Sequence, residues 1–482
     1  MIDLRPILYI LGRILFVLAI LMLAPAIIDH RAGLDNGADF LEAAVITGSI
    51  GGLVALATLN GLGRGFDARQ AYLLTVAIWV VVPLFGALPL MLGAPGLGLT
   101  DAYFEAVSGI TTTGSTVIAG LDDLPPGMNL WRGMLNWLGG LGIAFVAMIF
   151  LPVMRTGGMQ FFRTEGFDTF GKALPRATDI ARQLLGVYAG LTVICAAVYG
   201  AIGMTALDAV VHALTTIATG GFSPRASSFN RYAGAGEYVG ALFMIVASLP
   251  YIRYVQLVNG QAGPLWRDAQ VRGYLRIVAA GVATVTIWRS ATSDMAVEPA
   301  FRESLFNLAS IVSGSGFSSG SFAAWGGFAM VVAFVMGLIG GCSGSSSSAL
   351  TVFRVQVTGA ALLAQIRRIN TPSRISPVKY DGRRVNADVM GALMLYVTGY
   401  FLTMGVMSVA CTLTGVDMLS ALFAIWSSIG NIGYALGPML AETGTYRDFP
   451  GAAKWIMIIT MLMGRLGLLA LFLVVLPRFW QR

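Results

Sequence analysis

Four short loops rich in glycine, serine and threonine carry the residues best suited to chemistry in this chain. Each loop follows a segment too short to cross a bilayer and precedes a longer apolar run. The loops recur roughly every hundred residues, which indicates an internal repeat with one loop in each unit. They cover residues 111–116, 217–222, 313–318 and 430–435, and we align them on Gly114, Gly220, Gly316 and Gly433.

These loops are suited to binding a cation that has lost its water. Carbonyl oxygens can replace the hydration shell of such an ion, but one loop supplies only a few of them. Four loops around one axis would supply complete rings, and glycine permits the backbone angles that such loops need. A short helix before each loop would direct its partly negative C-terminal end at the ion. The predicted ring residues are Thr112, Thr113 and Gly114; Ala218, Thr219 and Gly220; Gly314, Ser315 and Gly316; and Asn431, Ile432 and Gly433.

Membrane-spanning helices must hold these loops, because irregular backbone at membrane depth is tolerated only inside protein or beside a water-filled path. The composition agrees: 56% of the 482 residues are hydrophobic and 11% are charged, whereas soluble domains carry about a quarter charged residues. We expect an all-α polytopic membrane protein with four pseudo-symmetric helix–pore-loop–helix repeats around one ion pore, plus two extra N-terminal helices. The expected units are residues 1–66, 67–178, 179–270, 271–384 and 385–482.

The apolar runs predict ten full spans, two in the N-terminal pair and two in each repeat. The first run, 7–28, contains Ala24-Pro25-Ala26, which looks like a signal-peptidase site. Its length favours a retained helix over a cleaved leader. The remaining expected spans cover residues 40–62, 71–92, 130–151, 180–204, 238–258, 273–287, 328–366, 387–413 and 455–476.

Loop charges set the orientation of these spans. The net charge of +7 fits basic cytoplasmic loops, and the chain lacks the aromatic-interleaved basic patch of a nucleic-acid binder. Acidic loops place the glycine loops at the outer face and both termini in the cytoplasm. Cys195, Cys342 and Cys411 are too widely spaced for a disulfide framework or a metal cluster.

A second irregular stretch interrupts the run 328–366, which is too long for one helix. It consists of Gly341, Cys342, Ser343, Gly344, Ser345, Ser346, Ser347 and Ser348. Small polar residues there can line a cavity but suit a lipid-facing helix poorly. Arg465 lies inside the last apolar run, and an intramembrane charge is a functional candidate. We expect this stretch and Arg465 to act together as a gate.

These features resemble the TrkH/KtrB family of potassium transport proteins, and the TrkH branch most closely. Besides the four loops, the resemblance rests on Trp137-Leu138-Gly139-Gly140-Leu141-Gly142, Gly157-Gly158-Met159-Gln160, Gly340-Gly341-Cys342-Ser343-Gly344 and Gly464-Arg465-Leu466. They span nearly the whole chain in the order that the family shows. The N-terminal helix pair is also typical of the TrkH branch.

The resemblance implies potassium (K⁺) uptake through a simple four-glycine selectivity filter. It also implies that an intramembrane gate and an arginine, Arg465, lie below this filter. It further implies a homodimer in the bacterial inner membrane, surrounded by lipid, with no organic cofactor. The chain has no glycine-rich nucleotide-binding motif after a strand, so a TrkA-like nucleotide-binding regulatory ring would be a separate cytosolic chain. The chain departs from the family in three features: Ser346-Ser347-Ser348 replace a glycine run, Thr351 replaces a lysine, and Gly467 replaces an acidic residue.

Two other functions remain as alternatives. Ion-coupled symport with H⁺ or Na⁺ needs a titratable site inside the membrane, and no acidic residue lies in the middle of an apolar run. An intramembrane serine protease would use Ser343 in Gly341-Cys342-Ser343-Gly344 and would need a base beside it. The two histidines, His30 and His212, lie in an expected outer loop and an expected pore helix, so we expect no enzymatic activity.

Overall fold

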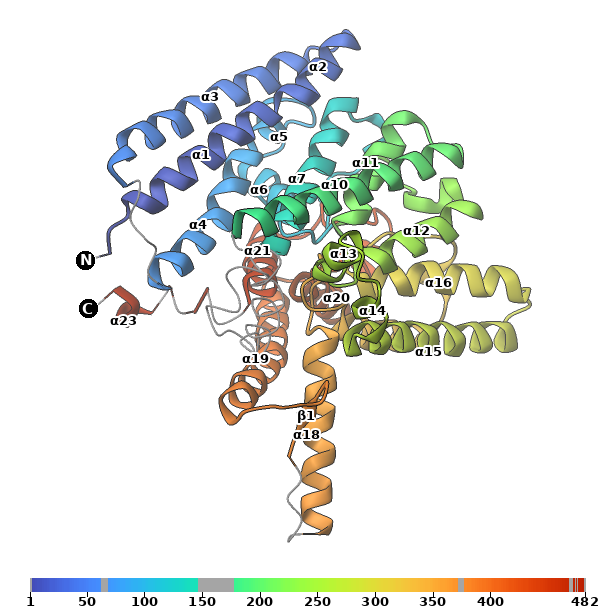
Figure 1. The fold of residues 1–482 in the computed structure, drawn as a ribbon. Helices are drawn as coiled ribbons and strands as arrows, with labels where there is room; N and C mark the ends of the chain where they lie inside the picture. The colour runs from blue at the N-terminus through green and yellow to red at the C-terminus, as the bar shows by residue number, and fades with distance from the viewer. Residues whose placement is uncertain are drawn as a thin grey trace.

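The computed structural model describes residues 2–61, 68–145, 177–371, 377–467, 471–472, 474 and 476–480, which are mostly helical. The N-terminal pair consists of α1 (Arg5–Leu21) with α2 (Leu23–Arg31), and α3 (Asn36–Ala57), followed by the short η1 (Leu59–Gly61). Gly12 and Gly51 lie where α1 and α3 cross. A Cβ atom on Gly12 would lie 2.7 Å from the Gly51 carbonyl oxygen, so small residues allow this close packing. The pair lies at one edge of the molecule (Figure 1).

Four repeats follow, each built from a long helix, a short helix, a loop and a second long segment. The long first helices are α4 (Ala68–Gly86) with α5 (Leu88–Leu92), α10 (Ala177–Ala201), α15 (Ala269–Thr292) and α19 (Ala387–Thr412). The short helices are α6 (Leu99–Ile110), α11 (Ala206–Ile217), α16 (Val297–Ser313) and α20 (Met418–Gly430). The second segments are α7 (Pro126–Phe145), α12 (Ala235–Ala247) with α13 (Tyr251–Val258), α17 (Gly327–Ile339) with α18 (Val352–Asn370), and α21 (Gly451–Leu466). The predicted architecture is therefore confirmed.

The prediction of unbroken second spans is wrong in two repeats. Six described helices are long and apolar enough to cross a membrane: α1 with α2, α3, α4 with α5, α10, α15 and α19. α12 and α13 meet at 91°, because Pro250 has no N–H to continue a helix. α21 ends at Leu466 before Gly467, whose φ is +77°. The break predicted in 328–366 is confirmed, although it covers 340–351.

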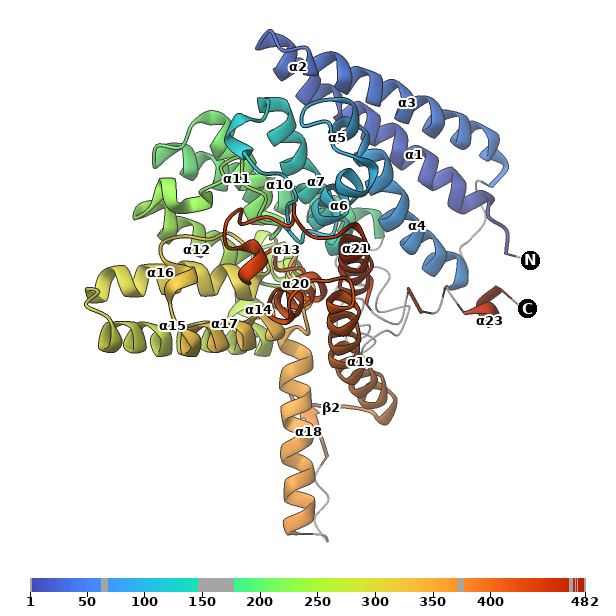
Figure 2. The same cartoon turned by 180° about the vertical axis from the view of Figure 1, so that it is seen from behind.

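α18 projects far from the rest of the molecule in both views (Figures 1 and 2). A small antiparallel hairpin of β1 (Lys379–Tyr380) and β2 (Arg383–Arg384) lies beside it. The remaining short elements are η2 (Leu121–Asp123), η5 (Ser228–Tyr232), α14 (Gly263–Arg267), η6 (Phe322–Ala324), η7 (Pro438–Leu440) and α23 (Pro477–Trp480). The two chain ends lie near each other.

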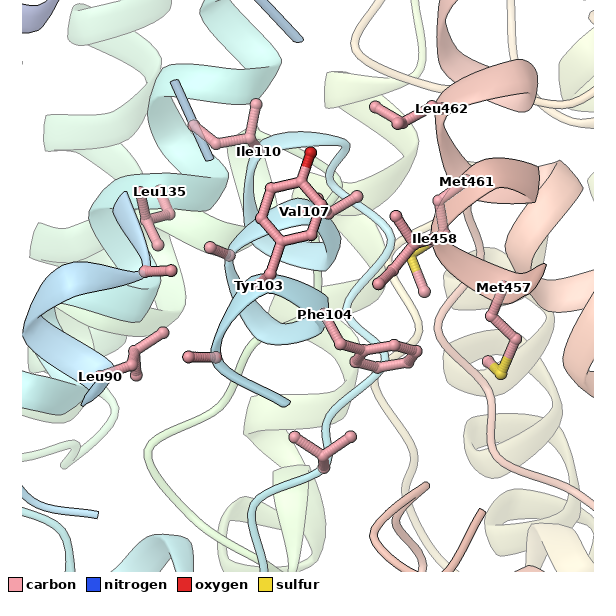
Figure 3. Close-up of a cluster of buried hydrophobic side chains, with 14 of the residues drawn as sticks. Leu90, Tyr103, Phe104, Val107, Ile110, Leu135, Met457, Ile458, Met461 and Leu462 are labelled. Carbon is pink, nitrogen blue, oxygen red and sulfur yellow. The ribbon is translucent and has the colours of Figure 1, made fainter. Parts of the chain in front are cut away.

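The short helices lie inside the protein, as the packing of α6 illustrates. Every residue of α6 from Ala102 to Ile110 is buried. Its apolar side chains pack on one side against Leu90 and Leu135, and on the other against α21 (Figure 3). Burying each large apolar side chain stabilises the fold by about 1.5–3 kcal/mol. The loop after α6 is therefore anchored to a firmly packed helix.

Candidate cation pathway

All four short helices end with the same backbone turn. In each, an N–H beyond the helix donates to the carbonyl five residues earlier, as in a Schellman motif. The pairs are Thr113 to Ser108 (2.8 Å), Gly220 to Thr215 (2.8 Å), Ser315 to Ser310 (2.9 Å) and Ile432 to Ser427 (2.9 Å). The residue before each donor has a left-handed φ: Thr112 (+51°), Thr219 (+51°), Gly314 (+77°) and Asn431 (+48°). A left-handed threonine is strained, and such strain concentrates at functional sites.

The backbone conformation shows that our alignment of the second loop on Gly220 is wrong by one residue. The residue after each donor is a glycine with left-handed φ, and these are Gly114 (+83°), Gly221 (+70°), Gly316 (+76°) and Gly433 (+88°). Gly221, not Gly220, is thus the counterpart of Gly114. Six residues before these glycines a hydroxyl residue now occurs in every repeat: Ser108, Thr215, Ser310 and Ser427. The earlier alignment placed Leu214 there, so this mismatch was the signal that could have revealed the shift.

The four loops contact one another in a closed cycle. A Cβ atom on any of the four left-handed glycines would clash with a carbonyl oxygen of the next loop. The clashing pairs are Gly114 with Gly220, Gly221 with Ser315, Gly316 with Ile432, and Gly433 with Thr113. All twelve predicted ring residues lie in these loops. Only Ala218 falls outside the structurally equivalent triplets, since it is the C-cap of α11 and its carbonyl accepts the Thr219 hydroxyl at 2.7 Å.

Side chains outside the cycle hold the loops in place. Asn136 of α7 donates to the Gly109 carbonyl at 2.8 Å and accepts from the Phe222 N–H at 3.1 Å, which joins the first two repeats. Asn431 donates to the Thr113 hydroxyl at 2.9 Å, which joins the fourth repeat to the first. Asn136 was not predicted, because its only signal in the sequence is a polar residue within an apolar run.

Buried or partly buried ion pairs brace the segments around the loops. Glu105 accepts from Arg132 at 2.9 Å, and Arg132 also donates to the Ser223 carbonyl at 3.1 Å. Such a pair is costly to break, because removing one partner leaves an unpaired buried charge. Similar pairs join Glu237 to Arg302, Glu303 to Arg289, and Asp101 to Lys454. None of these pairs was predicted from the sequence.

Neither histidine is hydrogen-bonded to Ser343 in the described part of the chain. His212 is buried, with its ring nitrogens near the Asp208 carbonyl (2.8 Å) and the Ser223 hydroxyl (3.1 Å). Ser343 instead pairs with the Thr351 hydroxyl at 2.9 Å. Among the described residues, no histidine, lysine or carboxylate is therefore hydrogen-bonded to the Ser343 hydroxyl to act as the base that a serine nucleophile needs. The same part holds no cluster of three His, Cys, Asp or Glu side chains that could bind a metal.

The segment between α17 and α18, residues 340–351, lies against the break between α12 and α13. Backbone groups of the two breaks form hydrogen bonds with each other. The Cys342 N–H donates to the Ser248 carbonyl at 3.0 Å, and the Tyr251 N–H donates to the Gly344 carbonyl at 2.9 Å. These two hydrogen bonds give partners to backbone groups that would be paired within the helix if the helices were continuous. The sharp bend at Pro250 is thus part of one structure with the interruption.

Two serines of this segment bond directly to the ends of the short helices. The Ser346 hydroxyl donates to the Ile217 carbonyl at 3.1 Å, and the Ser347 hydroxyl donates to the Ser313 carbonyl at 2.6 Å. Ile217 and Ser313 are the last residues of α11 and α16. The predicted gate residues 341–348 therefore lie immediately beside the loop-bearing helices of the second and third repeats.

Arg465 approaches the same segment from α21. It is 5% exposed, and its Nη1 donates to the Ser348 hydroxyl. A second arginine, Arg354, is also buried nearby. Its Nη1 donates to the Leu350 carbonyl at 2.8 Å, and its guanidinium lies 4.0 Å from the Tyr396 ring centroid. Arg354 was not predicted, because the residues of α18 were expected to form an ordinary membrane span.

Comparisons with known proteins agree with this arrangement. A family model described as "TrkH: Cation transport protein" matches residues 37–482. The Trk system potassium uptake protein TrkI of Halomonas elongata is 36% identical over 99% of this chain and 97% of its own length. TrkH of Vibrio parahaemolyticus is 31% identical over 99% of both chains. A crystal structure of the potassium transporter TrkH from Vibrio parahaemolyticus superposes with a TM-score of 0.91, at 28% identity and complete coverage of both chains.

Proposed function

Because the chain belongs to the TrkH family of cation transport proteins, we propose that it takes up K⁺ across the membrane through the centre of the four-loop cycle. The chain is a multi-pass membrane protein of a potassium uptake family. The location of the proposed K⁺ path rests on one observation. In a closed cycle, the left-handed glycine of each loop lies close to a carbonyl of the next loop. K⁺ is the cargo here, and not a resident cofactor.

The proposed ligands are backbone carbonyls of three equivalent positions in each loop. After the register correction these are residues 112–114, 219–221, 314–316 and 431–433. A K⁺ ion that loses its water needs several oxygen ligands at once, which a ring drawn from four loops can supply. The C-terminal ends of α6, α11, α16 and α20 add partial negative charge there. Hydroxyl pairs support two opposite loops, Thr111 with Thr113 (2.7 Å) and Ser313 with Ser315 (2.8 Å).

Flux from proteoliposomes tests this function. Purified protein should release K⁺ down its gradient faster than Na⁺, without a proton gradient. Release of both ions at the rate of protein-free vesicles would contradict the channel proposal. K⁺ accumulation that requires a proton or Na⁺ gradient would instead favour the symport alternative.

The segment 340–351 and Arg465 form the proposed gate. Its support is the hydrogen bonding of Ser346 and Ser347 to two helix ends, and the contact of Ser348 with Arg465. A cation that passed about 4 Å from Arg465, at an effective dielectric near 20, would meet a repulsion of about 4 kcal/mol before solvent screening. The arginine would therefore act as an electrostatic barrier below the ring.

Arg465→Ala is expected to raise basal K⁺ flux several-fold, because it removes both this barrier and the contact with Ser348. The ratio of K⁺ to Na⁺ permeability should change little, since the four-loop ring lies elsewhere. Paired flux assays in the two salts measure both quantities. Unchanged flux through correctly inserted protein would leave Arg465 with a packing role only.

We also propose that a TrkA-like nucleotide-binding ring docks on the cytoplasmic side of a homodimer in the bacterial inner membrane. The proposed docking surface is the far end of α18 with the hairpin beside it. Its support is the projection of α18 and the exposure of its basic side chains. The nearness of the two chain ends is consistent with both termini being cytoplasmic. The basic residues of this surface are Arg367, Arg368, Lys379, Arg383 and Arg384.

Reversing the charge of this surface should weaken binding of the partner. A variant with glutamate at positions 367, 368, 383 and 384 is expected to lose most co-purification with the regulatory ring, and more strongly at low salt, because exposed charges are screened over about 8 Å at physiological ionic strength. Glutamate at the exposed outer position Arg231 is the control and should have no effect. Equal co-purification of both variants would exclude α18 as the dock.

A further inference from the structure

The residue that follows each left-handed glycine of the loops lies at a boundary between two repeats. In the corrected register these residues are Ser115, Phe222, Phe317 and Tyr434. Three of the four are aromatic, and each aromatic ring packs against the repeat that precedes its own. The ring-centre distances to the preceding repeat are 4.3 Å from the Arg132 Cζ to Phe222, 4.8 Å from Phe229 to Phe317, and 4.8 Å from Phe322 to Tyr434.

Tyr434 adds a hydrogen bond to its aromatic contact. Its hydroxyl donates to the Phe317 carbonyl at 2.6 Å and also lies 2.9 Å from the Asn307 Oδ1 atom. Both partners belong to the third repeat, and Phe317 directly follows the left-handed Gly316 of the third loop. The side chain is buried, so water does not compete for this bond. Tyr434 therefore holds the third and fourth loops together immediately beside their glycines.

The boundary between the fourth and first repeats is built differently, because the residue after the glycine there is Ser115, which has no ring. Tyr446, which lies between η7 and α21, occupies this boundary and is fully buried. Its N–H donates to the Thr116 carbonyl at 2.8 Å, and its hydroxyl donates to the Tyr434 carbonyl at 3.0 Å. Tyr446 thus joins the residues that leave the first and fourth loops.

The two tyrosines form one hydrogen-bonded connection from the first loop through the fourth to the third. We propose that the hydroxyls of Tyr434 and Tyr446 are positioning groups that set the spacing of these loops and thereby the discrimination between K⁺ and Na⁺. A cation that has lost its water is selected by the spacing, number and field strength of the carbonyl oxygens around it. The tyrosines would act through those carbonyls without touching the ion. This inference rests on the proposed function of the four-loop cycle.

Removing one hydroxyl at a time tests this inference. In proteoliposomes containing the full chain, Tyr434→Phe should reduce the ratio of K⁺ to Na⁺ permeability by about two- to tenfold, the factor equivalent to the net energy of one hydrogen bond. The phenylalanine keeps the ring and its contact with Phe322, so the fold is retained. Tyr446→Phe should reduce the ratio in the same direction, because it frees the fourth loop from the same connection.

Tyr103→Phe is the matched control. The Tyr103 hydroxyl also donates to a main-chain carbonyl, that of Val80 at 3.1 Å, but this bond joins α6 to α4 within the first repeat. The control should lower the unfolding midpoint about as much as Tyr434→Phe and leave the permeability ratio unchanged. An unchanged ratio in Tyr434→Phe and Tyr446→Phe, or an equal loss in Tyr103→Phe, would overturn the inference alone. Equal K⁺ and Na⁺ permeability in the parent protein would contradict the proposed function as well.

Discussion

Gly316→Ser is expected to reduce the discrimination between K⁺ and Na⁺ by about tenfold or more, the change that corresponds to 1.4 kcal/mol. Two effects add at this position. The φ of Gly316 is +76°, which a serine adopts only with strain, and a Cβ atom there would clash with the Ile432 carbonyl. That carbonyl belongs to the neighbouring loop, so the substitution displaces a proposed ligand as well as its own backbone. Relative permeability in proteoliposomes measures the effect.

Gly326→Ser separates the two effects. Gly326 has a similar φ of +84°, but a Cβ atom there would meet no heavy atom within 4 Å. Its substitution therefore carries backbone strain without a clash against a loop carbonyl. We expect nearly normal selectivity from Gly326→Ser. Equal selectivity loss in the two variants would mean that strain alone explains the result, and would count against the proposed ring.

Removing the hydroxyls of Ser346 and Ser347 together should raise basal K⁺ flux by about 5- to 150-fold. The double alanine variant loses the bonds to the Ile217 and Ser313 carbonyls. A hydrogen bond contributes about 0.5–1.5 kcal/mol net, so two of them hold the segment against the helix ends by about 1–3 kcal/mol. Loss of this energy shifts the gate toward open conformations. Deleting residues 345–348 should act in the same direction and weaken dependence on the regulatory partner.

Ser345→Ala is the matched control for the gate. The Ser345 hydroxyl bonds only within the segment, to the Cys342 carbonyl at 2.7 Å and from the Ser347 N–H at 3.2 Å. It makes no bond to α11 or α16 in the described structure, so its removal should change flux far less than the double substitution. If Ser345→Ala opened the pathway as fully as the double variant, general loosening of the segment would be the better explanation.

The four loops could be predicted from the sequence because their backbone conformation restricts which residue types can occur in them. Left-handed φ at Gly114, Gly316 and Gly433 favours glycine, and so the repeat was visible in the spacing. The second loop has two adjacent glycines, Gly220 and Gly221, and spacing alone could not say which one takes the left-handed conformation. The choice depends on the close approach of Gly221 to the Ser315 carbonyl, which leaves no room for a Cβ atom and is a contact between repeats.

Other parts of the site depend on tertiary structure that the sequence did not reveal. Hydropathy merged α12 and α13 into one span, because apolar residues continue on both sides of Pro250. The roles of Asn136 and Arg354 were missed for a similar reason. Each is a single polar residue in a long helix, and its importance comes from partners elsewhere, such as Phe222 for Asn136 and Tyr396 for Arg354.

The closed cycle of loops is made by one chain, and this has a consequence for how the protein can vary. In an assembly of four identical subunits, any substitution would appear in every quadrant at once. Here the equivalent positions are already unlike: Thr113, Gly220, Ser315 and Ile432 occupy one level. A single substitution therefore changes the residue type in one quadrant only, and its effect reaches the next quadrant through the contact between adjacent loops. The four quadrants can accordingly differ from one another in a way that four identical subunits cannot.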